Sequence, residues 1–318
     1  MEKGNIAKVA LLHHDMESPE LKFKELFEQR GVLIDLVDIR STSKKELLDY
    51  DLIINRVYSS VVSRDSDILK KTLNLLRILE ISGKKCINSY RSSRADYSKF
   101  ELFKELSSKG IPTPKTVFLN SEHRIEKVSK LAEKRLGFPI VVKRDCGGKS
   151  YDVDMVKSFD DLVSSLKEKF RVASQEGYNK GFILQEFVSS VREHDCRVGI
   201  VGGNFEFSYA RSFIPRGSEE KWIASTSGGS VEFEYSPSEA EVNVAMRAAS
   251  VLDASFSESD IIMTSKGPFV IEVNISPSYF VDSIDDLHRM EIIVNNLINS
   301  YISSPSNDKR IISIEAAK

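Results

Sequence analysis

The N-terminal part of the sequence alternates short apolar runs with amphipathic stretches, and this alternation is the strongest constraint on the fold. Apolar runs at Ile6–Leu12, Val32–Val37 and Asp51–Asn55 are typical of buried strands. Helical patterns cover Pro19–Arg30 and about Ser66–Ile81. Strands that alternate with helices form βαβ units and a parallel sheet. No G-x-G-x-x-G sequence follows the first strand, so we do not expect a Rossmann dinucleotide site.

A second unit begins near Ala95, where helices alternate with strands, and a third stretch from Asp195 to Ala210 is typical of a hairpin. The expected helices are Asp96–Lys109, a helix with Asn120 or Ser121 as N-cap that stops at Gly137, one from Ser158 to about Phe170, one from Ser238 to about Leu252 and one over about Asp285–Ile302. The expected strands are Thr116–Leu119, Pro139–Lys143, one from Tyr151, Gly181–Val188, a hairpin over Asp195–Ala210, Ile261–Thr264 and Phe269–Asn274.

Composition narrows the class of protein. Lys and Arg number 45 against 47 Asp and Glu, for a formal charge of −2, which offers no bulk field for a nucleic acid. The three cysteines, Cys86, Cys146 and Cys196, form no C-x-x-C pair and are typical of reduced thiols in the cytoplasm. The first apolar run is too short for a signal sequence or a membrane span. We expect a cytoplasmic protein with no nucleic-acid or membrane partner.

The sequence Gly147-Gly148-Lys149-Ser150 resembles half of a Walker A motif, but the match fails. That motif needs a glycine at position 143, where Lys143 stands, and a helix after the loop, where a strand pattern follows. Two interpretations stay open. The loop can fold its backbone N–H groups over an anion beside Lys143, or it is a plain turn with a solvated lysine.

A second cluster combines two carboxylates and a carboxamide. Glu272 and Asn274 are two residues apart on one expected strand, so both point to the same face, and antiparallel pairing brings Asp260 near them. Hard oxygen ligands of this kind suit Mg²⁺. The alternative is a solvated outer face, but the apolar residues around Glu272 argue against it because a polar group there needs a partner.

Three further charged residues lie on or beside the expected hairpin. Asp195 and Arg197 share one face of its first strand, and Arg211 follows its second strand. They are explained either by ion pairing across strands or by a phosphate clamp.

Two other features stay open. We expect His13 and His14 to be a surface pair, and Trp222 either packs under its loop, which we favour, or stacks on a substrate.

Together these segments resemble ATP-grasp ligases, most closely the RimK and glutathione-synthetase branch of carboxylate–amine ligases. The resemblance extends from about Ala95 to Phe280, and the N-terminal unit is similar to the pre-ATP-grasp domain of that superfamily. It implies an α/β chain of three units: a parallel βα domain at residues 1–94, and the two α+β halves of an ATP-grasp fold, with antiparallel sheets, at residues 95–185 and 186–318. It is carried by Phe138–Lys143, Leu184–Val188, Asp195–Val198, Arg211, Asp260 and Ile271–Pro277, which stand in the order and approximate spacing of that family.

The resemblance implies ATP and Mg²⁺ as cofactors, with two ions expected and Mn²⁺ as an alternative. It implies that Arg197 and Arg211 lie at the γ-phosphate and that Asp260, Glu272 and Asn274 are the metal ligands. The implied nucleotide-binding residues are Lys99 and Lys143 at the phosphates, Gly147, Gly148 and Ser150 in a closing loop, Gln185, Glu186, Phe187 and Val188 along the adenine, and Asp195 at the ribose.

The implied reaction forms an acyl phosphate from a carboxylate and ATP, and an amine then converts it to an amide. The substrates would be an amino acid, a peptide or a small metabolite, and the family often forms dimers or tetramers. Trp222 and Ala224 replace an Arg-x-Asn segment of many relatives, and Ser278 replaces a glycine. These departures leave the substrate open. Two alternatives are a phosphotransferase acting on a hydroxyl, with Arg216 and Lys221 near the cleft, and a nucleotide-binding protein without catalysis.

Overall fold

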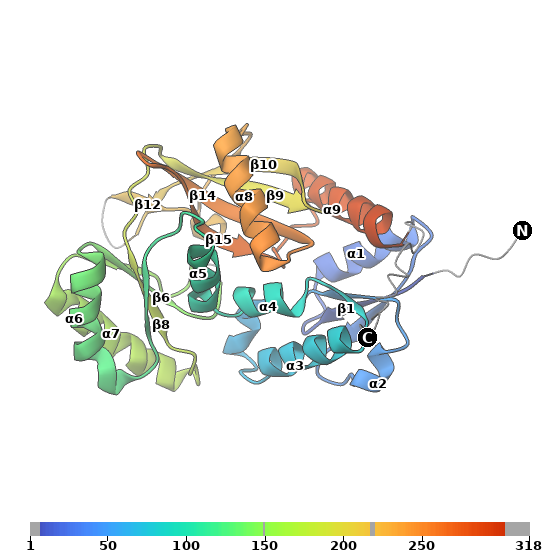
Figure 1. The fold of residues 1–318 in the computed structure, drawn as a ribbon, viewed down its shortest axis with the longest axis horizontal. Helices are drawn as coiled ribbons and strands as arrows, with labels where there is room; N and C mark the ends of the chain where they lie inside the picture. Colours follow the sequence, from blue (N-terminus) through green and yellow to red (C-terminus); the bar gives the residue numbers. More distant parts are fainter. Residues whose placement is uncertain (1–6, 149, 217–219, 303–318) are drawn as a thin grey trace, which may run out of the picture.

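The computed structural model describes residues 7–148, 150–216 and 220–302. Three larger sheets organise these residues, and Figure 1 shows them in different regions of an elongated molecule. None of the described helices is both long and apolar enough to cross a membrane.

The N-terminal sheet is parallel, as expected, with strand order β2-β1-β3-β4. Val9 to Leu12 of β1 are fully buried, because β1 is an inner strand of a parallel sheet, whereas Leu33 on the edge strand β2 is exposed. The strands are β1 (Lys8–His13), β2 (Leu33–Asp38), β3 (Leu52–Asn55) and β4 (Lys85–Ile87), and the helices are α1 (Ser18–Glu28), α2 (Lys44–Leu47) and α3 (Ile68–Ile81).

The central sheet is antiparallel with strand order β5-β8-β6-β7, and α6 and α7 lie together on it (Figure 1). Its strands are β5 (Thr116–Leu119), β6 (Ile140–Arg144), β7 (Asp154–Val156) and β8 (Phe182–Glu186), and its helices are α6 (Ile125–Leu136) and α7 (Phe159–Gln175). Helix α7 extends past the expected end near Phe170 because the buried stripe of Leu162 and Leu166 continues to Ala173.

The C-terminal sheet has order β13-β10-β9-β14-β15, and α8 packs against β9, β14 and β15. Strand β14 begins at Phe256, five residues before the expected Ile261, because the buried Ser257 and Ser259 hide the apolar pattern. The remaining elements are β9 (His194–Val201), β10 (Asn204–Ser212), β11 (Ile214–Pro215), β12 (Lys221–Ile223), β13 (Glu232–Phe233), α8 (Glu239–Leu252), β14 (Phe256–Thr264), β15 (Gly267–Asn274) and α9 (Ile284–Leu297).

The helix expected from Asp96 to Lys109 is α5 (Lys99–Ser108), which begins three residues later than expected, and the sequence pattern missed the short helix α4 (Tyr90–Asp96) before it. Ser98 is the N-cap of α5, and its hydroxyl accepts a hydrogen bond from the Glu101 N–H. The Asp145 carboxylate, just after β6, accepts from the Phe100 N–H at 2.7 Å and from the Ser98 hydroxyl at 2.9 Å. These bonds hold the first turn of α5, and with it Lys99, against the loop that follows β6.

His13 and His14 are not a surface pair, so that expectation was wrong. Only 4% of His13 and 5% of His14 is exposed. The His14 Nδ1 lies 2.8 Å from an Asp15 carboxylate oxygen. Residues distant in the chain contact both histidines: the His13 carbonyl accepts from the Ile39 N–H at 2.9 Å, and the His14 Nε2 lies 3.7 Å from an Asp65 carboxylate oxygen.

Asn88 joins the N-terminal sheet to the C-terminal sheet. Its Nδ2 donates to the carbonyls of Phe256 at 3.0 Å and Ile275 at 2.8 Å, and its Oδ1 accepts from the N–H groups of Ser255 at 2.8 Å and Phe256 at 3.2 Å. The residue is 0% exposed, so no water can replace these bonds.

We expect Asn88→Ala to lower the free energy of unfolding by about 3 kcal/mol, because it leaves backbone groups at the start of β14 and just after β15 without partners. Urea denaturation followed by circular dichroism measures this change. The exposed Asn74 on α3 provides the control, since Asn74→Ala should change stability by less than about 0.5 kcal/mol. Equal effects of the two substitutions would contradict the role of Asn88.

Candidate active site

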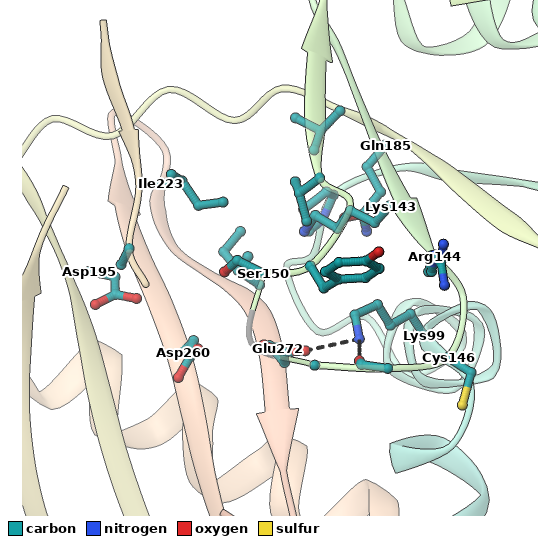
Figure 2. Close-up of a pocket in the computed structure, with 18 of the residues that line it drawn as sticks. Lys99, Lys143, Arg144, Cys146, Ser150, Gln185, Asp195, Ile223, Asp260 and Glu272 are labelled. Carbon is teal, nitrogen blue, oxygen red and sulfur yellow. Dashed lines mark hydrogen bonds and ion pairs between the residues drawn. The ribbon is translucent and has the colours of Figure 1, made fainter. Parts of the chain in front are cut away.

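A cavity of about 400 Å³ is lined by residues of the central and C-terminal sheets and of the segment after β3 (Figure 2). Thirteen of the fifteen site residues expected from the sequence line it, and Arg197 and Asn274 do not. The thirteen are Lys99, Lys143, Gly147, Gly148, Ser150, Gln185, Glu186, Phe187, Val188, Asp195, Arg211, Asp260 and Glu272.

The two carboxylates of the expected metal site are direct neighbours across a strand pair. Asp260 on β14 lies opposite Glu272 on β15, and the register shifts just after Asp260. Such irregularities are common beside active sites because they re-aim side chains. Asn274 lies opposite Glu258, and its Nδ2 donates to the Glu258 carbonyl at 3.5 Å. The expected ligands therefore share one end of this hairpin, although the Asn274 side chain does not line the cavity.

Oxygen donors of this kind fit a magnesium ion. In the described residues, no group of three or more His, Cys, Asp and Glu side chains could hold a metal by itself. The candidate set is smaller: two carboxylates and a carboxamide. Mg²⁺ usually takes one or two protein carboxylates and completes its shell with waters and substrate phosphates, so Asp260 and Glu272 suffice.

Two arginines surround Asp260. Arg197 on β9 donates to both Asp260 oxygens, at 2.6 and 2.9 Å, and Arg211 on β10 donates to Oδ2 at 2.7 Å. Burial alone would raise the pKa of Asp260, but the two guanidinium groups outweigh it and lower that pKa to about 2. Asp260 is therefore a carboxylate at every physiological pH.

Ion pairing across strands, one of the two interpretations of Asp195, Arg197 and Arg211, is present. Arg211 lies opposite Asp195 in the β9–β10 pair and donates to both of its oxygens, through Nε at 3.1 Å and through Nη2. Asp195 and Arg211 are each about 5% exposed. Arg211 also lines the cavity, so it can meet a phosphate there, whereas Arg197 acts on the cavity through Asp260.

Lys99 connects the glycine loop to the expected metal site. Its Nζ lies 3.2 Å from a Glu272 carboxylate oxygen and donates to the Gly147 carbonyl at 2.6 Å, as the dashed lines in Figure 2 show. Burial lowers the pKa of Lys99, but the nearby Glu272 carboxylate outweighs this effect and raises it overall. Lys99 therefore carries a permanent positive charge at this end of the cavity.

Lys143, on β6, has no hydrogen bond or ion pair to any described residue. Burial lowers its pKa to about 8, with Lys99 contributing in the same direction and Glu272 opposing. A cation without a direct partner in a cavity is ready to bind an anion.

The affinity for ATP should therefore depend on pH through Lys143. Below pH 8 the lysine is charged and attracts phosphate, and above pH 8 it loses its proton and this attraction. We expect ATP to bind about tenfold more weakly at pH 9 than at pH 7, measured by isothermal titration calorimetry. In Lys143→Arg the charge persists at both pH values. An equal loss of ATP affinity between pH 7 and pH 9 in this variant would show that a group other than Lys143 causes the pH dependence.

The loop after β6 leads into the strand β7 and not into a helix, which confirms that it is not a Walker A motif. Gly147 has φ +121° and Ser150 has φ +52°, backbone values that bend the chain back over the cavity. Lys149 lies outside the described residues. At the base of the loop Arg144 binds Asp152 at 2.9 Å and Glu176 at 2.6 Å, an anchor that the sequence pattern did not indicate because its members are far apart in the chain.

The segment Gln185–Val188 leaves β8 along one wall of the cavity. Gln185 is 1% exposed, and its Nε2 donates to the Thr116 hydroxyl at 3.0 Å. The Glu186 carboxylate accepts from the Lys115 N–H at 2.9 Å, so it secures the start of β5. Phe187 packs edge-to-face on Trp222 with ring centroids 6.3 Å apart. Trp222 also lines the cavity, so packing and stacking on a substrate both stay open for it.

Sequence reasoning missed Glu258, a buried carboxylate that hydrogen-bonds to Arg197 beside Asp260. It is 1% exposed and accepts hydrogen bonds from the hydroxyls of Tyr279 at 2.8 Å and Tyr209 at 3.3 Å, and from Arg197 at 3.4 Å. The one available signal was its place two residues before Asp260 on the same strand, which puts both side chains on one face. Sequence reasoning also missed the cavity wall formed by Ser60, Val62, Ser63 and Arg64.

Comparison with known proteins identifies the family to which this chain belongs. The model of the RimK-like ATP-grasp domain matches residues 96–302. A probable alpha-L-glutamate ligase of Coxiella burnetii is 25% identical over 248 residues, which cover 78% of this chain and 75% of that protein. One of Saccharophagus degradans is 24% identical over 304 residues, 91% of this chain and 93% of that protein.

The solved structures agree on the fold. D-cycloserine synthetase DcsG has a TM-score of 0.67 at 16% identity and covers 90% of this chain and 98% of its own. The D-alanine–D-alanine ligase of Bacillus anthracis complexed with ATP has a TM-score of 0.64 at 18% identity and covers 93% and 96%. The chain belongs to the RimK-like ATP-grasp family, and it is an ATP-dependent ligase that joins a carboxylate to an amine.

Proposed function

We propose that this ligase joins a free amino acid, as the amine, to the carboxylate of a second amino acid, a peptide or a small metabolite. The observation that carries the proposal is one cavity in which Asp260 and Glu272 face each other across a strand pair beside Lys99, Lys143 and Arg211. The names of the curated relatives, probable alpha-L-glutamate ligases, support L-glutamate as the first amino acid to test.

ATP would bind with its phosphates toward the lysines. Lys99, Lys143 and the backbone of Gly147, Gly148 and Ser150 would hold them, while Gln185 to Val188 would line the adenine and Asp195 the ribose. Asp260, Glu272 and Asn274 would hold Mg²⁺, two ions on the family pattern. When bound, Mg²⁺ neutralises phosphate charge, which phosphoryl transfer requires.

The chemistry proceeds in two displacements. An oxygen of the substrate carboxylate attacks the γ-phosphorus, ADP leaves, and an acyl phosphate forms. The neutral amine then attacks the acyl carbon, inorganic phosphate leaves, and the amine gives up a proton. Arg211 and Lys143, which line the cavity, would stabilise the charge that develops on the transferred group, and Arg197, which donates to Asp260, would keep that carboxylate oriented.

The direct test is ADP formation by the full chain with ATP, Mg²⁺, a pool of amino acids and a pool of carboxylates, followed by mass spectrometry of the products. We expect ADP, phosphate and an amide product from at least one pair. ATP binding without turnover on any pair would contradict the proposal. A stable phosphorylated product would instead indicate a phosphotransferase.

Glu272→Gln should separate nucleotide binding from chemistry. It keeps the shape of the side chain but removes a charge from the proposed metal site, so we expect turnover to fall at least about 100-fold while ATP affinity changes less than about tenfold. Steady-state kinetics and calorimetry measure the two effects. Glu168→Gln on the exposed face of α7 is the control and should leave both unchanged. Normal turnover in Glu272→Gln would contradict the assignment of Glu272 as a metal ligand.

Three expectations stay predictions: the unit boundaries after residues 94 and 185, a cytoplasmic location, and assembly into a dimer or tetramer. Sedimentation velocity of the full chain tests the last.

A further inference from the structure

The far end of the glycine loop has an uncommon backbone conformation. Ser150 has φ +52° and Asp152 has φ +58°, and they stand on either side of Tyr151. Among the described residues only one other non-glycine residue, Asp253, has a positive φ, and it is the C-cap of α8. Non-glycine residues keep this conformation where surrounding contacts hold them in it, and such positions gather at ligand clamps.

Two cations hold the Asp152 side chain. The Arg144 Nε donates to one carboxylate oxygen at 2.9 Å. The Lys169 ammonium group donates to the other oxygen, and to the Asp152 carbonyl at 3.0 Å. The side chains of Arg144 and Lys169 are 7% and 5% exposed, and that of Asp152 is 17% exposed. Ion pairs this deeply buried hold one geometry, because a buried charge without its partner is costly.

Tyr151 fixes the loop to the end of α7. Its hydroxyl donates to the Glu176 carboxylate at 2.7 Å, and the Arg144 guanidinium lies 4.8 Å from the centre of its ring. Arg144 also donates to Glu176, at 2.6 Å. Inside the loop, the Tyr151 N–H donates to the Gly148 carbonyl at 3.2 Å. The same side chains therefore hold both the bend of the loop and its attachment to α7.

These contacts lie outside the part of the loop that would meet the nucleotide. Asp152 and Lys169 do not line the cavity, whereas Gly147, Gly148 and Ser150 do. A loop with two adjacent glycines has many backbone conformations, and it loses them when it binds a ligand. A loop that is already bent loses fewer, so its ligand binds more tightly.

We propose that Asp152 is a positioning residue for nucleotide binding. With Arg144, Tyr151, Lys169 and Glu176, here called the loop anchor, it keeps the glycine loop bent over the cavity before the nucleotide enters. The inference rests on the proposed function, because it takes the phosphates of ATP as the ligand of this loop. It assigns part of the ATP affinity to a carboxylate that does not touch ATP.

Asp152→Asn tests the loop anchor, because it keeps the size of the side chain and its tolerance of a positive φ but removes the charge. Calorimetry of the full chain with ATP and Mg²⁺ measures binding. We expect ATP to bind about 10- to 30-fold more weakly, since the bent loop becomes a minor conformation. In the ligase reaction KM for ATP should rise by the same factor. The loop is formed once ATP is bound, so kcat should change less than about twofold.

Hydrogen exchange of the free protein gives a readout that does not depend on activity. The Tyr151 amide is hydrogen-bonded inside the loop, so it should exchange at least about tenfold faster in Asp152→Asn than in the wild-type chain. ATP with Mg²⁺ should remove most of this difference. Equal exchange rates in the two free proteins would contradict the role of Asp152 in holding the loop.

Asp154 provides a matched control, because its carboxylate lies 2.8 Å from the same Lys169 ammonium group. It belongs to β7, beyond the loop, and its side chain is 50% exposed. Asp154→Asn should leave ATP affinity and the exchange of the Tyr151 amide unchanged. Equal losses of ATP affinity in Asp152→Asn and Asp154→Asn would assign the effect to the charge around Lys169 and overturn the loop anchor.

Two further variants separate the ion pairs from the backbone and from stability. Glycine adopts a positive φ without strain, so Asp152→Gly removes the ion pairs alone, and it should weaken ATP as Asp152→Asn does. Wild-type affinity in Asp152→Gly would overturn the loop anchor. Thermal melting shows whether each variant is folded. If Asp152→Asn does not fold, Glu176→Gln, at a side chain that is 37% exposed, gives the same test with an expected loss of about 3- to 10-fold.

The outcomes separate this inference from the proposed function. ATP binding that depends on Asp152 in a chain that forms no amide would support the loop anchor and contradict the proposed function. Unchanged ATP affinity in Asp152→Asn would overturn the loop anchor, even where the chain joins an amino acid to a carboxylate.

Discussion

The buried ion pairs around Asp260 are the interaction on which the site depends. A carboxylate that is 5% exposed is costly unless cations surround it, and Arg197 and Arg211 supply three hydrogen bonds. These partners come from two strands, β9 and β10, so the pairing register of the C-terminal sheet decides whether Asp260 is stable where it lies. Glu272, on the neighbouring strand β15, lies opposite Asp260 and pairs with Lys99.

This arrangement balances charge within the cavity before any ligand enters. Arg211 is held by Asp195 and Asp260, and Lys99 by Glu272. A nucleotide brings negative charge and its metal ions bring positive charge, so they can replace these ion pairs within the protein. Replacing existing ion pairs costs less free energy than filling a cavity that contains no charged groups. Lys143 differs, because it has no ion partner among the described residues and burial lowers its pKa.

Much of the fold could be predicted from local pattern. The parallel N-terminal strands, the hairpin β9–β10 and the strand β15 are continuous apolar or alternating runs that end at turn residues, so their positions were expected to within a few residues. The errors have physical causes. Strand β14 carries two buried serines, α4 and α5 are separated by a capping serine, and the histidines after β1 are buried by loops that are distant in sequence.

The sequence by itself determined the chemical types and their order along the chain: a lysine near the end of β6, a glycine loop, and an acid and an amide two residues apart on a strand. Side chains two residues apart on a strand lie on the same face, so the sequence alone predicted that Glu272 and Asn274 share a face. Only the tertiary structure decided the partners. Asp260 meets Arg197 and Arg211, Asn88 meets β14 and β15, and Arg64 reaches the cavity. These contacts join segments far apart in the sequence, and strand register and loop packing set them, which no local pattern encodes.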